Sequence, residues 1–421
     1  MRKRLIALLL SLMMTLVLLP ASFAEEDPAA ENPEPAESLE PAEGLRAAGD
    51  VSIDSTNFPD DNFRNYVQNN LSHVDPSYFT PAEIADIKVI DDCGFCNIEN
   101  LQGIELFTSL ETLNCQDNQL MDIDVSAMPS LKKLDCHSNP LSGTIQIHEN
   151  LEELECWNSQ IDGTRILIPM NSRLRVVKVD ASGFSDLSFL YGLDLETLDC
   201  AYIDFESLDF TPWNNLHDLR CDNCNLTSLN VSGLLNLTRI RANDNNLTEL
   251  DVSIVPALEE LYVYNNHIAA LDLSACVQLR DAELNQTADG LMTEDSGHYL
   301  FDLTSIGVTD ASKVTINGAD WTLDTGTGVA TYNGSGIPNQ LVYTYDTGNP
   351  TFPMQVTVTL GVAVTVDPDD FDPGFFNWLL NKGIVNDSGN GVYTISSAVT
   401  ELDCSYEGLT SLKGIGYFQT S

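Results

Sequence analysis

Residues 110–120 read LETLNCQDNQL, residues 131–141 read LKKLDCHSNPL and residues 151–161 read LEELECWNSQI. Six further segments follow in the same register. The sixth position of the nine segments is occupied in turn by Cys115, Cys136, Cys156, Val179, Cys200, Cys221, Ala242, Val263 and Leu284. These positions are 21, 20, 23, 21, 21, 21, 21 and 21 residues apart. A fixed period of about twenty residues predicts a solenoid of stacked coils.

The alternation of apolar and polar residues within a segment predicts which side chains point into the solenoid. In residues 216–226, Leu219 and Cys221 alternate with polar neighbours, which is the period of a half-buried strand. A free thiol packs as a small apolar group, and Ala242 or Val263 fills the same position in other coils. The position therefore needs apolar volume rather than thiol chemistry. Three residues later the sequence places Asn118, Asn139, Asn245 and Asn266, which we expect to be buried and to bind backbone groups of adjacent coils.

The repeated pattern L-x-x-L-x-L/C-x-x-N-x-L is the signature of leucine-rich repeats. We therefore predict a leucine-rich-repeat solenoid with a parallel β-sheet on its concave face, preceded by a helical N-terminal cap. A small all-β module and a second, truncated cap with one repeat should follow. Return segments such as residues 227–236 have no apolar stripe of helical period, so we expect short extended or 3₁₀ returns.

Changes in composition divide the chain into six segments. Residues 1–24 begin with basic residues, continue with an apolar run and end in small residues, which predicts a secretory signal peptide. Residues 25–50 are acidic and rich in Pro and Ala, which predicts a disordered linker. Residues 51–86 should form the helical cap, with a capping box in 80–83, and residues 87–289 the repeats.

The C-terminal part repeats this organisation. Residues 290–366 carry short β-branched and aromatic alternations separated by Asn-Gly and Asp-Thr-Gly turns, which predict the small all-β module. Within residues 367–421, DPDDFDPGFFNWLLNKGI matches DSTNFPDDNFRNYVQNNL of the first cap, so a second cap and the first coil of a truncated array are expected. An apolar coil left open at a terminus is unfavourable, so we expect this chain to be a fragment of a longer protein.

The charge of the chain excludes some classes of partner. It has 63 acidic and 19 basic residues and a formal net charge of −44, whereas nucleic-acid binding needs clustered Lys and Arg. After the predicted signal peptide no apolar run is long enough for a membrane span. We therefore expect an exported protein, secreted or on the cell surface, that is a monomer and does not bind nucleic acid.

Of the ten cysteines, five occupy the inward repeat position, and Cys404 repeats that position in the second array. Those in the inward repeat position should be buried free thiols, although exported chains commonly form disulfides. Cys93 and Cys96 lie in the insertion DDCGFC, and we expect this pair to form a disulfide if any pair in the chain does. Neither this pair nor the C-x-x-C of residues 221–224 supplies the four ligands of a structural zinc site, so no metal or cofactor is predicted.

The chain resembles a family of exported leucine-rich-repeat proteins of Gram-positive bacteria, broadly internalin-like. The resemblance rests on NFPDDNFRNYV in the cap, on NLQGIELF and SLKGIGYF in the entry coils, and on LxxLxCxxNxLTxLxVS in the repeats. It covers residues 51–421 and implies a surface or secreted recognition protein. Some relatives carry a calcium-loop-like sequence in the cap. HVDPSYFTPAEI of this chain keeps Glu83 but lacks most of the oxygen ligands, so calcium binding is not expected.

Two groups of exposed strand residues are candidates for ligand binding. Lining up the strands brings together Arg220, Arg239, Arg241, Tyr262 and Tyr264. Arg binds carboxylates and phosphates, and Tyr offers rigid contact area. The alternative is that these arginines pair within the chain with Asp218, Asp222, Glu260 and Glu283. The second group is His137 and Trp157 on consecutive coils, where Trp157 either stacks on a ligand or packs locally.

The sequence contains no H-E-x-x-H, G-x-S-x-G or phosphate-binding loop, so no enzymatic activity is predicted. We predict instead that the chain binds an extracellular protein or glycan through its concave face. One alternative is that it is the targeting region of a larger secreted hydrolase whose catalytic domain lies beyond residue 421. Another is a spacer scaffold that has no ligand.

Overall fold

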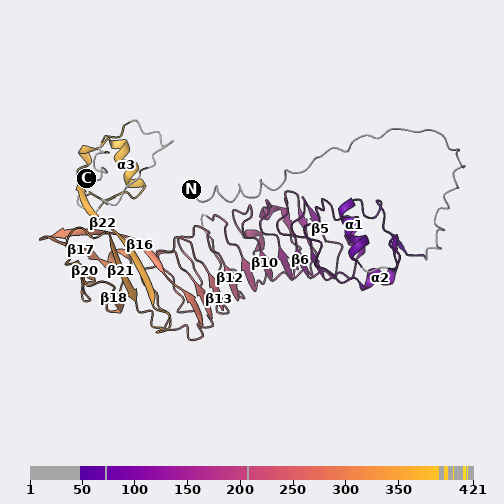
Figure 1. Cartoon of the computed structure of the whole chain (residues 1–421), viewed down its shortest axis with the longest axis horizontal. Helices are drawn as coiled ribbons and strands as arrows, with labels where there is room; N and C mark the ends of the chain where they lie inside the picture. The colour runs from indigo at the N-terminus through magenta and orange to yellow at the C-terminus, as the bar shows by residue number, and fades with distance from the viewer. Residues whose placement is uncertain are drawn as a thin grey trace, which may run out of the picture. The chain divides into compact units, whose positions relative to one another are not determined.

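Each repeat contributes one short strand to a parallel sheet in the computed structural model, which describes residues 48–71, 74–205, 208–387, 393–396, 402, 411–413 and 415 (Figure 1). The predicted signal peptide and nearly all of the predicted linker lie outside these residues. The ten strands, in sheet order, are β15 (Asp281–Glu283), β14 (Glu260–Tyr262), β13 (Arg239–Arg241), β12 (Asp218–Arg220), β11 (Thr197–Asp199), β10 (Val176–Lys178), β8 (Glu153–Glu155), β6 (Lys133–Asp135), β4 (Thr112–Asn114) and β3 (Val89–Ile90).

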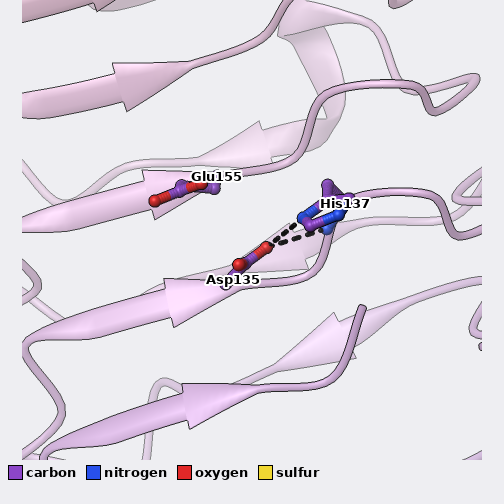
Figure 2. Close-up of side chains that lie close together, drawn as sticks. All are labelled: Asp135, His137 and Glu155. Carbon is purple, nitrogen blue, oxygen red and sulfur yellow. Dashed lines mark hydrogen bonds and ion pairs between the residues drawn. The ribbon is translucent and has the colours of Figure 1, made fainter. Parts of the chain in front are cut away.

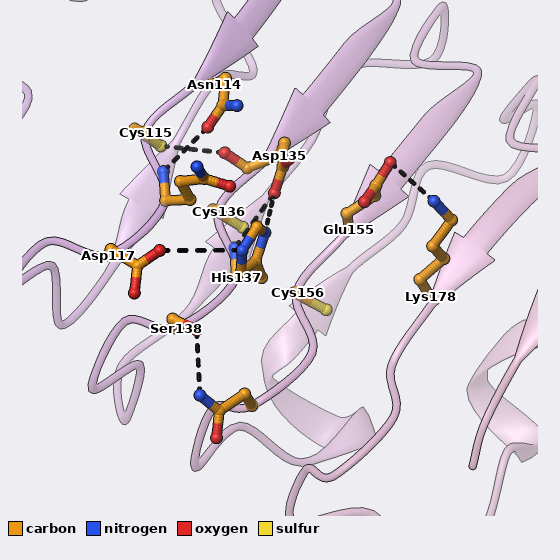
Figure 3. Close-up of polar contacts among 12 residues, drawn as sticks. Asn114, Cys115, Asp117, Asp135, Cys136, His137, Ser138, Glu155, Cys156 and Lys178 are labelled. Carbon is orange, nitrogen blue, oxygen red and sulfur yellow. Dashed lines mark hydrogen bonds and ion pairs between the residues drawn. The ribbon is translucent and has the colours of Figure 1, made fainter. Parts of the chain in front are cut away.

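The register of the sheet follows the repeat. Asp218 of β12 lies opposite Arg239 of β13, and Arg220 lies opposite Arg241, so equivalent positions of successive repeats form columns. The residue at the centre of each strand points into the solenoid, as does the residue after the strand. The predicted inward positions are confirmed, because the five predicted cysteines have no exposed surface: Cys115, Cys136, Cys156, Cys200 and Cys221. Figure 3 shows the first three of them on successive coils.

The four repeat asparagines are buried as predicted, with exposed fractions between 0% and 5%. The amide nitrogen of Asn139 donates to the carbonyl oxygens of Cys115 and Cys136, at 3.0 Å in each case. Its Oδ1 accepts from the backbone N–H of Leu120 at 3.0 Å. One side chain thus satisfies backbone groups in two coils, which a turn between stacked coils otherwise leaves unpaired.

The return segments have both of the predicted conformations. Three of them pair in a second parallel sheet, formed by β5 (Ile123–Asp124), β7 (Ile145–Gln146) and β9 (Ile166–Leu167). Single 3₁₀ turns also occur: η1 (Ile104–Leu106) and η3 (Ser188–Leu190) lie in other returns, and η2 (Gly163–Arg165) directly precedes β9. Such short returns fit a repeat of about 21 residues, which leaves too little chain for a helix of several turns.

Two helices cover the N-terminal end of the repeat array, beside a two-stranded antiparallel sheet of β1 (Val51–Ser52) and β2 (Tyr78–Phe79). Asp60 caps α1 (Asp61–Asn70) by accepting from the backbone N–H of Phe63, and the predicted capping box of Thr80 and Glu83 starts α2 (Pro81–Asp86). Phe58 is fully buried and its ring centroid lies 6.2 Å from that of Phe107 in the first coil. The helical cap therefore shields the apolar end of the solenoid from water.

A β-module follows the last repeat. It consists of β16 (Gln286–Asp295), β17 (His298–Asp302), η4 (Leu303–Ile306), η5 (Ala311–Lys313), β18 (Val314–Ile316), β19 (Trp321–Asp324), β20 (Val329–Tyr332), β21 (Gln340–Tyr345) and β22 (Met354–Val366). The sheet order is β18-β21-β22-β16-β17-β20-β19, and β16 pairs with β22 in parallel. The first strand begins at Gln286, before the predicted start of the module at residue 290.

The β-module shares one hydrophobic core with the repeats, which the sequence did not predict. The Tyr343 hydroxyl donates to the carbonyl oxygen of Ala269 in the last coil at 2.8 Å. Gln286 takes the part of the repeat asparagine, because its Nε2 donates to the carbonyl oxygens of Val263 and Leu284, at 2.8 Å each. The module therefore covers the open end of the array as the cap covers the other end.

The helix expected in the second cap is present. Asp372 caps α3 (Pro373–Asn381) and accepts from the backbone N–H of Gly374 at 3.0 Å, after the short η6 (Pro368–Asp370). Phe371, Phe375 and Phe376 form a small separate core with neighbouring residues. β23 (Val385–Asp387) pairs with β24 (Tyr393–Ser396), and most of the coil predicted after them lies outside the described residues. None of the helices in the described part of the chain has the length and apolarity needed to cross a bilayer.

Candidate functional site

A groove of about 950 Å³ lies on the outer face of the ten-stranded sheet and is the candidate site. Strands β8 to β15 and the turns after them supply its side chains. It is lined by Glu155, Trp157, Lys178, Asp180, Thr197, Leu198, Asp199, Tyr202, Asp218, Arg220, Asp222, Arg241, Asn243, Asp244, Tyr262, Tyr264 and Glu283. Recognition pockets commonly have volumes of roughly 300–1,000 Å³, so the groove is large enough to hold a ligand.

The groove contains four of the five residues of the first predicted group. Arg220, Arg241 and Tyr262 follow one another in a single column of the sheet, and Tyr264 lies two residues beyond Tyr262. Arg239 does not line the groove. It stands in the neighbouring column between Asp218 and Glu260, because the inward residue Ile240 separates it from Arg241.

The arginines are paired with carboxylates of their own chain. Arg220 contacts Asp199 at 3.1 Å and Asp222 at 2.8 Å. Arg239 contacts Asp218 at 2.6 Å and Glu260 at 2.5 Å. The internal pairing that the sequence left as an alternative is therefore present, with Asp199 as an additional partner. Among the described residues no ion pair joins an arginine to the fourth expected partner, Glu283. These two guanidinium groups have little capacity left for an anionic ligand.

The remaining cations of the groove are also paired. Arg241 lies 3.7 Å from Glu260, and its guanidinium carbon lies 5.6 Å from the ring centroid of Tyr262. The ammonium group of Lys178 contacts Glu155 at 3.1 Å. An anionic ligand would have to replace one of these carboxylates, which reduces the net gain in binding free energy.

Carboxylates are in excess in the groove, where seven acidic side chains face three basic ones. Asp180, Asp244 and Glu283 form no ion pair with a Lys or Arg of the described chain. Asp244 accepts from the side-chain amides of Asn243 at 2.7 Å and Asn265 at 2.8 Å. Partial burial raises the pKa of Asp180 to about 6, the like charge of Asp199 adds to the rise, and Arg220 opposes it. The groove thus has a negative potential that its own cations do not cancel.

Four aromatic side chains stand beside these carboxylates. Tyr202 is 54% exposed, and Trp157, Tyr262 and Tyr264 are half-buried. Burial raises the pKa of Tyr264, and the nearby charges of Asp244 and Glu283 raise it further. Tyr202 was missed by the sequence analysis because it lies in the turn after the strand, where its φ of 58° places it in the left-handed region. Tyr202 is the second residue after the inward Cys200, and the equivalent position is polar in most coils. An aromatic residue at this position is the signal that could have revealed it.

The second predicted group, His137 and Trp157, is stacked. Their ring centroids are 3.8 Å apart and their planes differ by 11°. Trp157 lines the groove, whereas His137 is only 8% exposed and lies outside it. The local-packing interpretation of Trp157 is therefore correct for one face of its ring, which His137 covers.

His137 also belongs to a cluster with Asp135 and Glu155, shown in Figures 2 and 3, which the sequence analysis missed. The Nδ1 atom of His137 lies 2.5 Å from Oδ1 of Asp135. Oε1 of Glu155 contacts Lys133 at 2.9 Å and Lys178 at 3.1 Å. Burial acts to raise the pKa of Glu155, but these two ammonium groups outweigh burial and lower it.

Cys93 and Cys96 are free thiols in this structure, so the suggested disulfide is not formed there. The Cys93 thiol donates to the carbonyl oxygen of Asn114 at 2.9 Å, and that of Cys96 donates to the carbonyl oxygen of Gly94 at 3.3 Å. Cys93 is fully buried, whereas Cys96 is half-exposed. Burial raises the pKa of Cys93 to about 12, and the nearby Cys96 and Asp92 raise it further.

Comparison with known proteins agrees with this architecture. Residues 108–148 match the family model of leucine rich repeats (two copies). Among solved structures, the functional domain of InlJ from Listeria monocytogenes, described as including a cysteine ladder, is 18% identical, and the match covers 75% of this chain and all of that one with a TM-score of 0.40.

Two further internalins from Listeria monocytogenes are similar. InlF is 20% identical over 56% of this chain and 72% of its own, with a TM-score of 0.41, and InlP is 17% identical over 74% and 98%, with a TM-score of 0.39. A search of curated proteins found no match. The stacked register and the buried asparagines give this chain the fold of a leucine-rich-repeat solenoid, and residues 108–148 match the family model.

Proposed function

We propose that this chain is an exported, non-enzymatic binding protein whose groove holds a Lys- or Arg-rich segment of an extracellular protein. The observation that carries the proposal is that Asp180, Asp244 and Glu283 have no cationic partner in the described chain, although they line the same groove as the tyrosine rings. The sequence alone suggested that the arginines receive a ligand. Because the arginines are already paired with carboxylates, the groove favours a cationic ligand rather than an anionic one.

The energetics of the groove favour a cationic ligand. An incoming ammonium or guanidinium group gains from carboxylates that are already partly desolvated and does not have to break an internal ion pair. The rings of Tyr202 and Tyr264 add cation–π attraction, worth about 0.5–1 kcal/mol at an exposed site. A neutral glycan would use the same tyrosines for stacking but would gain nothing from the charge, so we place a basic protein segment first.

Binding of defined peptides tests the polarity of the groove. We expect a fluorescein-labelled oligolysine peptide to bind the mature chain in fluorescence anisotropy, with an affinity that falls as salt rises, while oligoglutamate and uncharged Gly-Ser peptides do not. The double variant Asp244→Asn/Glu283→Gln should weaken oligolysine binding by about tenfold, which corresponds to about 1.4 kcal/mol. Equal binding of all three peptides would contradict the proposal. Binding to a glycan array without binding to any of the three peptides would also contradict it and would assign the groove to a sugar.

A matched control separates the groove from the overall charge of the chain. Glu249 is exposed and lies outside the groove, and Glu249→Gln changes the net charge by the same amount as Glu283→Gln. We expect Glu249→Gln to change oligolysine binding by less than about twofold, because salt screens an exposed charge that does not line the groove. If both substitutions weakened binding equally, the attraction would come from the whole acidic surface and the groove would not be a specific site.

The exported location is proposed from the signal-peptide pattern of residues 1–24 and from the resemblance of the cap and repeat motifs to exported leucine-rich-repeat proteins. Expression in a Gram-positive host should give a mature chain that begins at Glu25 and is found in the medium or on the cell surface. N-terminal sequencing of the fractionated protein checks this. Retention of Met1 on a cytoplasmic product would contradict it.

A further inference from the structure

Two neighbouring strands bring three metal-ligating side chains together beside the groove. Asp135 ends β6 and Glu155 ends β8, and the register places them opposite each other, while His137 follows Asp135 by two residues. One ligand atom from each of the three residues lies within 4.8 Å of the other two. All three are more than nine-tenths buried, with exposed fractions of 7%, 8% and 7%. Figure 2 shows the three side chains at the ends of the two strands.

We propose that Asp135, His137 and Glu155 bind one divalent metal ion of the zinc class. Two carboxylates and one imidazole match the ligand preference of Zn²⁺ and of neighbouring divalent transition metals. Nδ1 of His137 lies 2.5 Å from Oδ1 of Asp135. An ion between these atoms holds its ligands roughly 3.3 Å apart, as zinc bond lengths and a tetrahedral angle require. The three ligand atoms lie within 4.8 Å of one another, so the side chains need to move by no more than roughly 1.5 Å.

The surroundings of His137 support the site. Oδ2 of Asp117 lies 3.9 Å from Nε2 of His137, on the ring atom that the metal does not use. A carboxylate in this place is the usual outer partner of a metal-bound histidine, because it fixes the orientation of the ring. Trp157 stacks on the imidazole at 3.8 Å and restrains its plane. Figure 3 shows the carboxylates of Asp117 and Asp135 on either side of the imidazole.

The local charge leaves room for a divalent cation. The carboxylates of Asp117, Asp135, Glu153 and Glu155 contact this cluster or its lysines, and they face the two ammonium groups of Lys133 and Lys178. Four negative and two positive charges leave a net charge of −2, which one divalent ion neutralises. Both lysines contact Oε1 of Glu155, so Oε2 is the atom available to the metal.

Titration of Zn²⁺ into the mature chain by isothermal calorimetry tests the site. We expect one ion per chain. His137→Asn and Asp135→Asn should each reduce the affinity for zinc at least tenfold, because removing a direct ligand costs more affinity than removing an outer-shell partner of a ligand. His217→Asn is the matched control, because His217 is exposed and distant in sequence from the cluster, and it should leave the affinity unchanged. Zinc binding that survives His137→Asn unchanged, or that falls equally in His217→Asn, would overturn the proposal.

A second measurement guards against a variant that fails to fold. Ni²⁺ should quench part of the tryptophan fluorescence of the wild-type chain, because Trp157 lies in contact with the ligand His137. Trp157→Phe should abolish most of this quenching while the calorimetric stoichiometry stays at one. Quenching that persists in Trp157→Phe would place the ion near another tryptophan and refute the assignment. The metal titrations contain no peptide, so their result does not depend on whether the groove binds a peptide.

Discussion

The buried asparagine of the repeat gives the sharpest stability prediction. The amide of Asn245 donates to the carbonyl oxygens of Cys221 at 2.9 Å, Ala242 at 3.1 Å and Asn243 at 3.3 Å. Its Oδ1 accepts from the backbone N–H groups of Cys224 at 3.0 Å and of Leu226 at 2.9 Å. The substitution Asn245→Ala removes all these contacts and leaves buried backbone groups without partners, because the side chain is only 5% exposed.

The magnitude follows from the number of bonds. Each lost hydrogen bond between buried groups costs about 1 kcal/mol, so the four shorter contacts together give a loss of about 4 kcal/mol in the free energy of unfolding. Asn245→Ser should cost less, because Ser159 occupies the equivalent position of another coil and donates to the Cys156 carbonyl at 2.7 Å. Asn236 is exposed, and Asn236→Ala should cost less than about 0.5 kcal/mol.

Equilibrium unfolding of the mature chain in urea, followed by circular dichroism, measures these differences. The midpoint should fall most for Asn245→Ala, less for Asn245→Ser and hardly for Asn236→Ala, at an unchanged m-value. A smaller m-value for Asn245→Ala would mean that the stack no longer unfolds as one unit, since its two halves are coupled only through adjacent coils. A loss below about 1 kcal/mol, or one equal to that of Asn236→Ala, would refute the reasoning.

Three further predictions address the groove, the thiols and the β-module. The raised pKa of Asp180, about 6 against an ordinary 3.8, corresponds to about 3 kcal/mol at 1.36 kcal/mol per pH unit. Because Asp180 is partly exposed, solvent screening reduces this free energy, so Asp180→Asn should stabilise the fold by about 1 kcal/mol above pH 6. The gain should vanish below pH 4, where the wild-type carboxyl is protonated. Melting temperatures that show the same gain at both pH values would contradict this prediction. Iodoacetamide should modify Cys96 at least about tenfold faster than Cys136, because burial raises the pKa of Cys136 well above its usual range, and mass spectrometry identifies the product. A Cys96 that reacts only after reduction would instead indicate a disulfide. Gly290→Ala should cost about 1–3 kcal/mol in urea unfolding, because its added Cβ would lie 2.4 Å from the ring of Phe301, and an unchanged midpoint would contradict that contact.

The repeat by itself determined the stacking of this protein. A coil of about 21 residues cannot bury its leucines alone, so apolar residues at a fixed spacing require parallel stacking and a fixed register. This is why the inward cysteines, the buried asparagines and the short returns could all be predicted. The cap helices followed from local signals as well, since Asp60 and Thr80 supply their N-caps without help from distant residues.

Only the tertiary structure decided what the outer face presents. Whether Arg220 is available depends on rotamers that bring it between Asp199 in the preceding coil and Asp222 in its own, and the spacing of residues does not specify rotamers. The same holds for Asp135, His137 and Glu155, which meet because two neighbouring strands end side by side. Burial is a collective property of a solenoid and is encoded in every repeat, whereas the polarity of its groove depends on individual contacts between coils.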